Sequence, residues 1–153
     1  MIGQPISPEI FRLIVRYTPL ASIDFVMEDE SGHVLVGLRN NEPACGTWFL
    51  PGGIIRKNET IGDAFQRILK TETGCVANIG EAEFLGIYEH FYDTNRFREP
   101  GYGTHYVVQG YRLKLGFRPN IALDDQHKTI RWMTGAEILA APDVHENAKA
   151  YFR

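Results

Sequence analysis

The stretch from Gly53 to Gly74 combines residue types and spacings that suit a phosphorylated ligand. Glu72 offers carboxylate oxygens, which hard divalent cations such as Mg²⁺ prefer, and Arg67 offers a guanidinium that can bind phosphate oxygens in a bidentate manner. Each has a structural alternative. Arg67 can pair with Glu59 or Glu72 and hold a loop against a helix, whereas Glu72 can be a solvated helix charge.

A helix should carry Arg67 and Glu72. Thr60 can cap its N-terminus and Gly74 can end it, after a loop at 51–53 that follows the apolar run 48–50. Its apolar residues fall on one stripe, formed by Ile61, Ala64, Phe65, Ile68 and Leu69. The two charged side chains therefore lie off that stripe, in the C-terminal half of the helix.

Other side chains suited to hydrolysis lie far from this stretch. His127 follows Gln126, and an imidazole with an ordinary pKa of about 6.5 can take a proton from an attacking water. The alternative is a surface histidine in a polar loop. Arg39 should end a strand, where its guanidinium can face the oxygens of a phosphorylated ligand.

Asp24 is a further candidate. It should lie in a strand and share one face with Ser22 and Val26, while Ile23 and Phe25 take the other face. On the residues alone, its alternative is a carboxylate on the wet face of an edge strand.

Alternation and turn residues predict the other elements. We expect strands at 20–27, 33–38, 84–91, 105–115 and 129–133, helices at 8–16, 134–141 and 143–152, and a loop beside the site at 94–103. Strands and helices interleave irregularly, which favours an α/β (α+β) fold with a mixed sheet covered by helices on both faces. A length of 153 residues without an internal linker predicts one domain, 1–153.

The composition narrows the classes of ligand that the protein can bind. A formal net charge of −3 gives no general attraction to nucleic acid or to an anionic membrane, so we expect a small ligand held by a few placed cations. The apolar segment 10–15 is too short and too charged for a signal sequence or membrane span, which predicts a cytoplasmic location. Cys45 and Cys75 have no spacing typical of a metal site or a disulfide framework.

The spacing of glycine, glutamate and arginine in 53–74 resembles the Nudix box of diphosphate hydrolases. Ile68 and Thr71 stand where the usual box has metal-binding carboxylates. The GDP-mannose mannosyl hydrolase subfamily resembles the chain with the same losses and along nearly its whole length. The similar blocks are YTPLASIDF at 17–25, WFLPGG at 48–53, EHFYD at 89–93, THYVV at 104–108, DQH at 125–127 and VHENAKAYF at 144–152.

The resemblance implies an α/β/α sandwich and a single Mg²⁺ or Mn²⁺ ion held by Glu72, Gln126 and the backbone carbonyl of Gly52. It implies hydrolysis of GDP-mannose or a related GDP-hexose by water attacking the sugar C1, with inversion, and His127 as the general base. It also implies a homodimer in which the N-terminal segment crosses to the partner.

Further site roles also come from the resemblance. Arg39, Arg67, Tyr106 and His90 match residues that contact the diphosphate or the leaving group, and Asp24 matches a sugar contact that aids the positive charge developing at C1. Ile54 departs from the subfamily, which often has arginine there, and its role is lost or passes to Arg56, Arg96 or Arg98. The aromatic candidates for stacking a guanine are Trp48, Tyr88, Phe91, Tyr92 and Tyr102.

Two rival functions stay open. One is an ordinary Nudix pyrophosphohydrolase that cleaves a nucleotide sugar at phosphorus to give GMP and a sugar phosphate. The other is a silent Nudix domain that binds a nucleotide sugar without turnover. The missing carboxylates count against the first, and the joint presence of Glu72, Gln126 and His127 counts against the second.

Overall fold

The structure is a computed structural model that describes residues 5–121 and 127–153, apart from the side chains of 127 and 128. Gln126 therefore lies outside the described residues. The elements follow the chain in the order α1 (Pro8–Tyr17), β1 (Leu20–Glu28), β2 (Val34–Arg39), β3 (Trp48–Phe49), β4 (Gly52–Ile54), α2 (Ile61–Thr73), η1 (Ile79–Glu81), β5 (Glu83–Tyr92), β6 (Thr104–Lys114), β7 (His127–Met133), α3 (Gly135–Ala140), α4 (Glu146–Lys149) and η2 (Ala150–Phe152).

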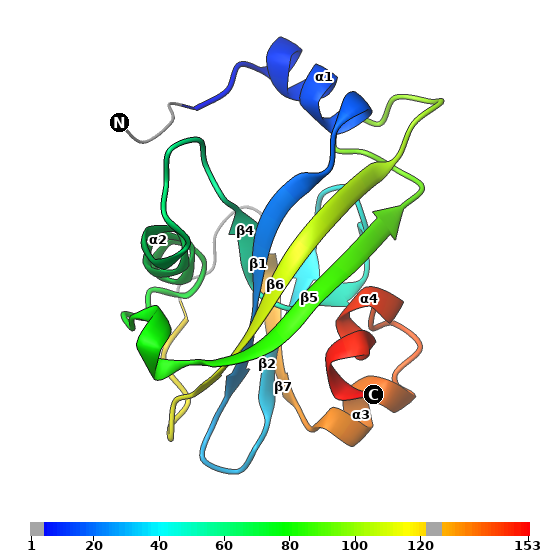
Figure 1. The fold of residues 1–153 in the computed structure, drawn as a ribbon. Helices are drawn as coiled ribbons and strands as arrows, with labels where there is room; N and C mark the ends of the chain where they lie inside the picture. The colour runs from blue at the N-terminus through cyan, green and yellow to red at the C-terminus, as the bar shows by residue number, and fades with distance from the viewer. Residues whose placement is uncertain (1–4, 122–126) are drawn as a thin grey trace.

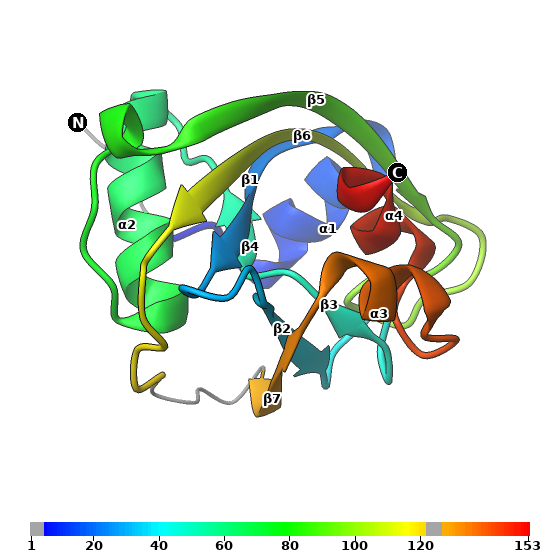
Figure 2. The same ribbon diagram turned by 90° about the horizontal axis from the view of Figure 1, so that it is seen from below.

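A mixed sheet of seven strands organises the chain, in the order β3-β2-β1-β6-β5 with β4 paired to β1 and β7 paired to β2. Strand β1 is central: it runs parallel to β6 from the pair Leu20 and Tyr106 onward, and antiparallel to β4. Helix α2 covers one face, and α3 and α4 lie on the other side (Figures 1 and 2). The predicted mixed sheet with helices on both faces is confirmed.

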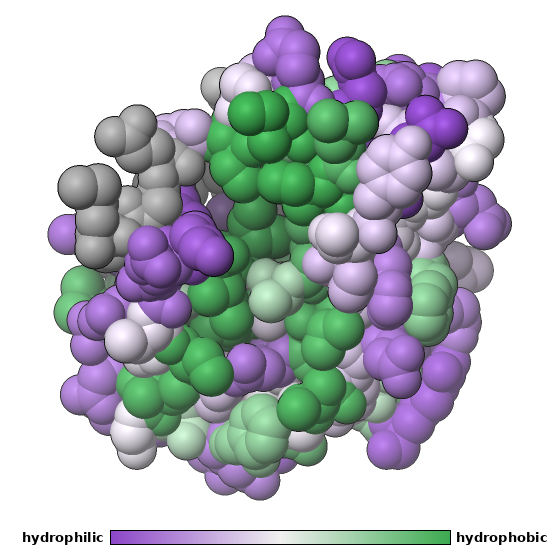
Figure 3. Space-filling model, turned by 45° about the horizontal axis from the view of Figure 1, so that its top comes forward, coloured by the Kyte–Doolittle hydropathy of each residue, from purple (hydrophilic) through white to green (hydrophobic). Residues whose placement is uncertain are grey.

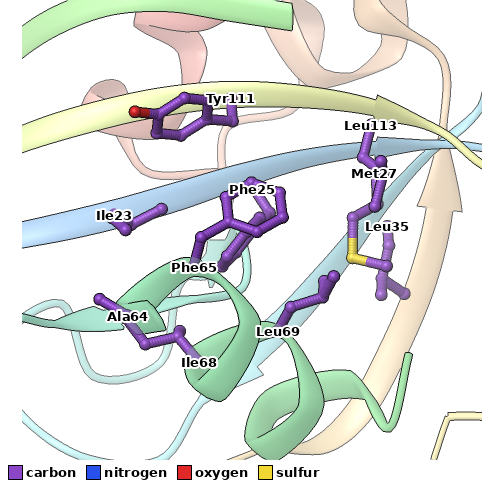
Figure 4. Close-up of a cluster of buried hydrophobic side chains, with 10 residues drawn as sticks. All are labelled: Ile23, Phe25, Met27, Leu35, Ala64, Phe65, Ile68, Leu69, Tyr111 and Leu113. Atoms are coloured by element: carbon purple, nitrogen blue, oxygen red, sulfur yellow. The ribbon is translucent and has the colours of Figure 1, made fainter. Parts of the chain in front are cut away.

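The first core lies between the sheet and α2. Alternate β1 residues, Ile23, Phe25 and Met27, point toward the helix and pack with its apolar stripe (Figure 4). Phe25 and Phe65 meet edge to face with ring centroids 5.0 Å apart. The predicted stripe of the box helix therefore supplies four of the ten buried residues of this core, and only Ile61, which is 43 % exposed, stays outside it.

The second core lies on the opposite face and is covered by the C-terminal helices. Its buried residues are Val26, Val34, Val36, Trp48, Phe49, Leu50, Ile138, Val144, Ala148 and Tyr151. Because Asp24 and Val26 are two residues apart in β1, the Asp24 side chain points into this second layer. Asp24 therefore lies on the sheet face opposite the one that α2 covers.

Helix α2 has the caps that the sequence predicts. The Thr60 hydroxyl accepts a hydrogen bond from the backbone N–H of Asp63 at 3.1 Å, and Gly74 ends the helix in the left-handed region with φ of 75°. Fixed ends hold Arg67 and Glu72 at defined places relative to the loop that precedes the helix.

The C-terminal segment differs from its prediction. The helix expected over 143–152 is instead α4 followed by the 3-10 turn η2. The cap is His145, whose Nδ1 accepts from the backbone N–H of Asn147 at 3.0 Å, so helix begins only after it. The segment before it serves the sheet, because the backbone of Asp143 accepts from the N–H of Trp48.

Helix α1 and the 94–103 loop support each other. The Arg12 guanidinium pairs with Glu99 at 2.5 Å, and the rings of Phe11 and Phe97 meet with centroids 5.9 Å apart. The fully buried Asn95 organises the loop, since its side chain donates to the carbonyls of Glu99 and Tyr102. The loop is thereby fixed beside the ends of β5 and β6.

Candidate active site

Asp24 is a buried carboxylate at the centre of the sheet. It is 7 % exposed, so the alternative of a wet edge strand is wrong. Its backbone pairs with Gly52, and a Cβ on Gly52 would lie 2.4 Å from Asp24 Oδ1. The Tyr151 hydroxyl donates to Asp24 Oδ2 at 2.8 Å. Burial raises the pKa of Asp24 to about 7, although the hydrogen bond from Tyr151 and the charge of Arg39 lower it.

His90 lies beside Asp24 and comes from β5. Its Nδ1 is 3.8 Å from Asp24 Oδ2, and the residue is 2 % exposed. Burial lowers the pKa of His90 to about 4, with a further contribution from His145. The imidazole is therefore neutral at pH 7, and its contact with Asp24 is not an ion pair. Its buried Nε2 has no hydrogen-bond partner within the described part of the chain.

Tyr106 and Arg39 complete the group. Tyr106 in β6 pairs directly with His90 in β5, so both side chains rise from the same sheet face. Burial raises the pKa of the Tyr106 phenol, and the positive charge of Arg39 lowers it. Arg39 ends β2, as predicted, and its Nε donates to the carbonyl of Pro43 at 2.8 Å. The structure brings Asp24, His90, Tyr106 and Arg39 together from four strands, and we call these four residues the Asp24 group.

Two residues near this group were not singled out from the sequence, His145 and Tyr151, and a third, Tyr92, was considered only for stacking a guanine. The Tyr92 ring lies 5.0 Å from that of His145 and 5.8 Å from that of Tyr106. Burial lowers the pKa of His145. His145 and Tyr151 belong to the block VHENAKAYF, so the resemblance carried a signal for them, but local spacing assigned them no partner.

Arg67 braces the loop before α2. Its Nε donates to Glu59 Oε2 at 2.6 Å, and its Nη2 donates to Glu59 Oε1 and to the carbonyl of Ile54, both at 2.9 Å. Glu59 Oε1 also accepts from the backbone N–H of Arg56. The hydrogen bonds from Arg67 are the largest cause of the lowered pKa of Glu59. The structural alternative for Arg67 is thus realised, and its diphosphate contact stays a prediction.

The predicted metal ligands lie on neighbouring elements. Gly52 is in β4 and Glu72 is in the last turn of α2, and these elements pack where Ile68 fills the space beside Gly53. The described residues contain no group of three or more histidine, cysteine or acidic side chains that could hold a metal ion. One carboxylate plus carbonyl and amide oxygens fits a single hard cation, which is the predicted donor set.

His127 begins β7, and its backbone lies opposite Arg39 of β2. The general-base candidate is thus attached next to a residue of the Asp24 group. Among the candidates for the role lost at Ile54, Arg96 is placed closest to the chemistry, because its charge lowers the pKa of Tyr106.

The aromatic candidates for base stacking are dispersed. Trp48 is buried, with the Arg131 guanidinium 4.0 Å from its ring centroid, and Tyr88 packs on Tyr151. Phe91 is 64 % exposed and stacks on His105. The structure therefore does not gather these rings into one stacking platform.

A mixed sheet between helices, with the box loop and box helix on one face, defines a Nudix domain. The family model described as NUDIX domain matches residues 18–153, and the chain belongs to the Nudix family of hydrolases. Members of this family act on nucleotide-type substrates with divalent metal ions such as Mg²⁺. No helix in the described ranges has the length and apolar content to cross a membrane.

Relatives and solved structures agree with this assignment. The low-salt glycan biosynthesis protein Agl8 of Haloferax volcanii is 40 % identical over 126 residues, which cover 82 % of this chain and 78 % of Agl8. A MutT protein from Methanosarcina mazei has a TM-score of 0.71 at 18 % identity, covering 89 % of this chain and 92 % of its own. The Nudix domain of Shewanella oneidensis NrtR, solved with ADP-ribose, has a TM-score of 0.66 at 21 % identity. The match covers 95 % of this chain and 89 % of the NrtR chain.

Proposed function

We propose that this Nudix hydrolase cleaves GDP-mannose or a related GDP-hexose between C1 of the sugar and the diphosphate, giving GDP and the free sugar with inversion. The observation that carries the proposal is the buried Asp24 set between His90, Tyr106 and Arg39. Attack at phosphorus generates negative charge, which a buried carboxylate repels. Departure of a diphosphate from C1 generates positive charge on the sugar, which a carboxylate stabilises.

In this proposal the leaving group needs charge stabilisation rather than a proton. Arg39 and Tyr106 supply a guanidinium and a phenol O–H that interact electrostatically, and both can donate to diphosphate oxygens. Mg²⁺ bound by the Gly52 carbonyl, Glu72 and Gln126 would neutralise diphosphate charge. A neutral His90 can donate one N–H and accept at its other nitrogen, which suits a sugar hydroxyl or the bridging oxygen.

His127 is proposed as the general base. Its backbone register opposite Arg39 attaches it at the edge of the Asp24 group, on the strand that follows Gln126. A neutral imidazole can accept the proton of the attacking water.

The box itself supports a reduced metal requirement. Ile68, at a position where the usual box has a carboxylate, is 2 % exposed and packs beside Gly53. This part of α2 therefore contributes to the core and offers no metal ligand. Cleavage at C1 with one ion is consistent with that loss.

The name of the relative Agl8 also supports a nucleotide-sugar substrate, because glycan biosynthesis consumes activated sugars. A shorter match points toward the rival reaction: an ADP-ribose pyrophosphatase of Methanocaldococcus jannaschii is 33 % identical over 70 residues, covering 46 % of this chain and 40 % of its own.

Hydrolysis of GDP-mannose with Mg²⁺ in heavy-oxygen water tests the proposal. We expect the label on mannose, unlabelled GDP, and a β-anomer visible by proton NMR immediately after cleavage. Label on a phosphate of GMP or mannose phosphate would instead establish the pyrophosphohydrolase. Binding without turnover would establish the silent nucleotide-sugar binder.

Two histidine variants test the assignment of His127 as the general base. His127→Gln should lower kcat on the order of a hundredfold or more with little effect on binding of GDP, because only proton transfer is removed. His33→Gln is the matched control, since His33 lies at the β1–β2 turn and contacts Asp29. An unchanged rate in His127→Gln would remove His127 as the base.

We also propose that the enzyme is a homodimer. Helix α1 exposes Ile10, Leu13 and Tyr17, each more than half exposed. Apolar side chains gather over the part of the molecule that carries this helix (Figure 3). A contact with a second subunit would cover them.

A further inference from the structure

We infer that Tyr151 is a positioning residue of the active site, which sets the orientation of the Asp24 carboxylate for its work at the sugar C1. The inference rests on the proposed function for the role of Asp24. The contact itself links η2, in the C-terminal layer, to the central strand β1 across 127 residues of sequence.

The contact is enclosed. Tyr151 is 6 % exposed and Asp24 is 7 % exposed, and the phenol O–H donates to Oδ2 at 2.8 Å. The Tyr151 ring is held by Tyr88, whose ring centroid lies 4.3 Å away, and by the edge of His90 at 6.0 Å. These ring contacts thus fix the position of the Tyr151 hydroxyl.

Two glycines leave the space that this pair occupies. A Cβ on Gly110 of β6 would lie 2.5 Å from Tyr151 Cε1, and a Cβ on Gly52 of β4 would lie 2.4 Å from Asp24 Oδ1. Both distances are too short for any real side chain. The strands on either side of β1 therefore lack side chains at the two places that admit the phenol and the carboxylate.

A single donor can fix the carboxylate because the χ2 torsion of aspartate is broad and roughly two-fold. The Tyr151 hydroxyl holds Oδ2, and Oδ1 is thereby turned over the Gly52 backbone. Hydrogen bonds to charged groups are the stronger ones, so the phenol can hold the group against rotation when the substrate binds.

Tyr111 provides a matched control. It is also 6 % exposed, and its hydroxyl donates to Gln109 Oε1 at 2.7 Å. It lies in the first core, on the α2 face of the sheet, away from Asp24. Removing its hydroxyl therefore takes the same atom from an equally buried tyrosine that does not touch the site.

The experiment compares Tyr151→Phe with Tyr111→Phe in GDP-mannose hydrolysis, alone and in an Asp24→Ala background. We expect Tyr151→Phe to lower kcat on the order of ten- to a hundredfold with KM changed less than about threefold. Tyr111→Phe should keep both constants within about twofold. In the Asp24→Ala background, Tyr151→Phe should lower kcat no further.

Equal losses in the two phenylalanine variants, or an undiminished loss in the Asp24→Ala background, would overturn the inference. If Tyr151→Phe does not fold, Gly110→Ala takes its place: the added methyl displaces the ring, and the same loss of kcat is expected.

If the wild type does not turn over GDP-mannose, the proposed function has failed, and urea unfolding tests the contact separately. Non-additive destabilisation by Tyr151→Phe and Asp24→Ala supports it, and additivity overturns it.

Discussion

Asp24 and His90 form a buried pair that binds nearly the same number of protons in the folded protein as in the unfolded chain. At pH 5 the unfolded chain has a charged aspartate and a charged histidine, with ordinary pKa values of 3.8 and 6.5. In the folded protein the pKa of Asp24 is about 7 and that of His90 is about 4, so both groups are neutral. At pH 5 the pair therefore holds one titratable proton in the unfolded chain and one in the folded protein. The pair therefore adds little pH dependence to stability between pH 4 and 6.5.

Removing one partner should expose the pH dependence of the other. In Asp24→Asn only His90 remains, and its lowered pKa predicts that stability rises from pH 4 to 6.5. In His90→Gln only Asp24 remains, and its raised pKa predicts that stability falls over the same window. Each change should be on the order of 3 kcal/mol relative to wild type, measured by urea unfolding in EDTA. Curves parallel to wild type would contradict the assignment of both pKa shifts.

The arginine missing at Ile54 should be replaced by Arg96. Arg96→Ala is expected to lower kcat/KM for GDP-mannose on the order of tenfold, because its charge acts on Tyr106 beside the proposed diphosphate site. Arg56→Ala is the control, since Arg56 is exposed and its backbone N–H bonds to Glu59. Equal effects of the two substitutions would contradict the choice of Arg96.

The sequence predicted which face of β1 Asp24 takes, because strand alternation is local. It did not predict that Asp24 is buried, since burial depends on β6 and β4 pairing on its two sides. It also assigned no role to Tyr151, whose partner is 127 residues away. Long-range contacts of single side chains leave no local pattern.

At the scale of elements, the brace between the box loop and α2 should be a stability feature. The Glu59 side chain is 1 % exposed and binds both Arg67 and the Arg56 backbone. Glu59→Gln is expected to lower the free energy of unfolding by about 1–3 kcal/mol, because charge-assisted bonds are weakened in a buried place. Glu83→Gln, in an exposed pair with Arg112, should change it by less than about 1 kcal/mol. Urea denaturation measures both, and equal effects would refute the brace.

Two glycines at the box should respond oppositely to alanine. Gly52→Ala places a methyl 2.4 Å from Asp24 Oδ1 and 2.5 Å from the Ile23 carbonyl, and should destabilise the protein by about 1–3 kcal/mol. Gly62→Ala lies in α2 with its nearest new contact at 3.8 Å, and should stabilise by about 0.5–1 kcal/mol. Thermal unfolding in EDTA separates the two. Destabilisation by Gly62→Ala would contradict this account of the helix.

Most elements could be predicted because their signals are local: Thr60 and Gly74 bound α2, and alternation marks β1 and β6. The last helix was predicted too long. His145 caps it in place of Asp143, because the 143 backbone is used by β3. A competing tertiary contact, invisible in local propensity, sets that boundary.

In the whole molecule, helix α2 and the buried Asp24 side chain lie on opposite faces of the sheet, and the proposed metal ligand Glu72 belongs to α2. Helix α2 closes the first core, while Asp24 and its neighbours lie under the C-terminal layer. The α1 surface belongs to neither core and is the predicted dimer contact. A change there should alter assembly before it alters the site.

Sedimentation tests that expectation. The wild type should sediment as a dimer, and Leu13→Asp should shift it to monomer, because a charge in an apolar contact is costly to desolvate. Val76→Asp is the control: Val76 is 84 % exposed and lies outside α1. A monomeric wild type at micromolar concentration would contradict the proposed homodimer.

Ile68 also constrains how this chain can change. The residue has joined the first core, where it touches the space left by Gly53. A glutamate returned to this position would be an unpaired charge in an apolar layer, at a cost of several kcal/mol. A multi-metal box cannot be regained by that substitution alone, since the core around it must first open. Packing in the first core, and not the chemistry of the site alone, therefore keeps this position apolar.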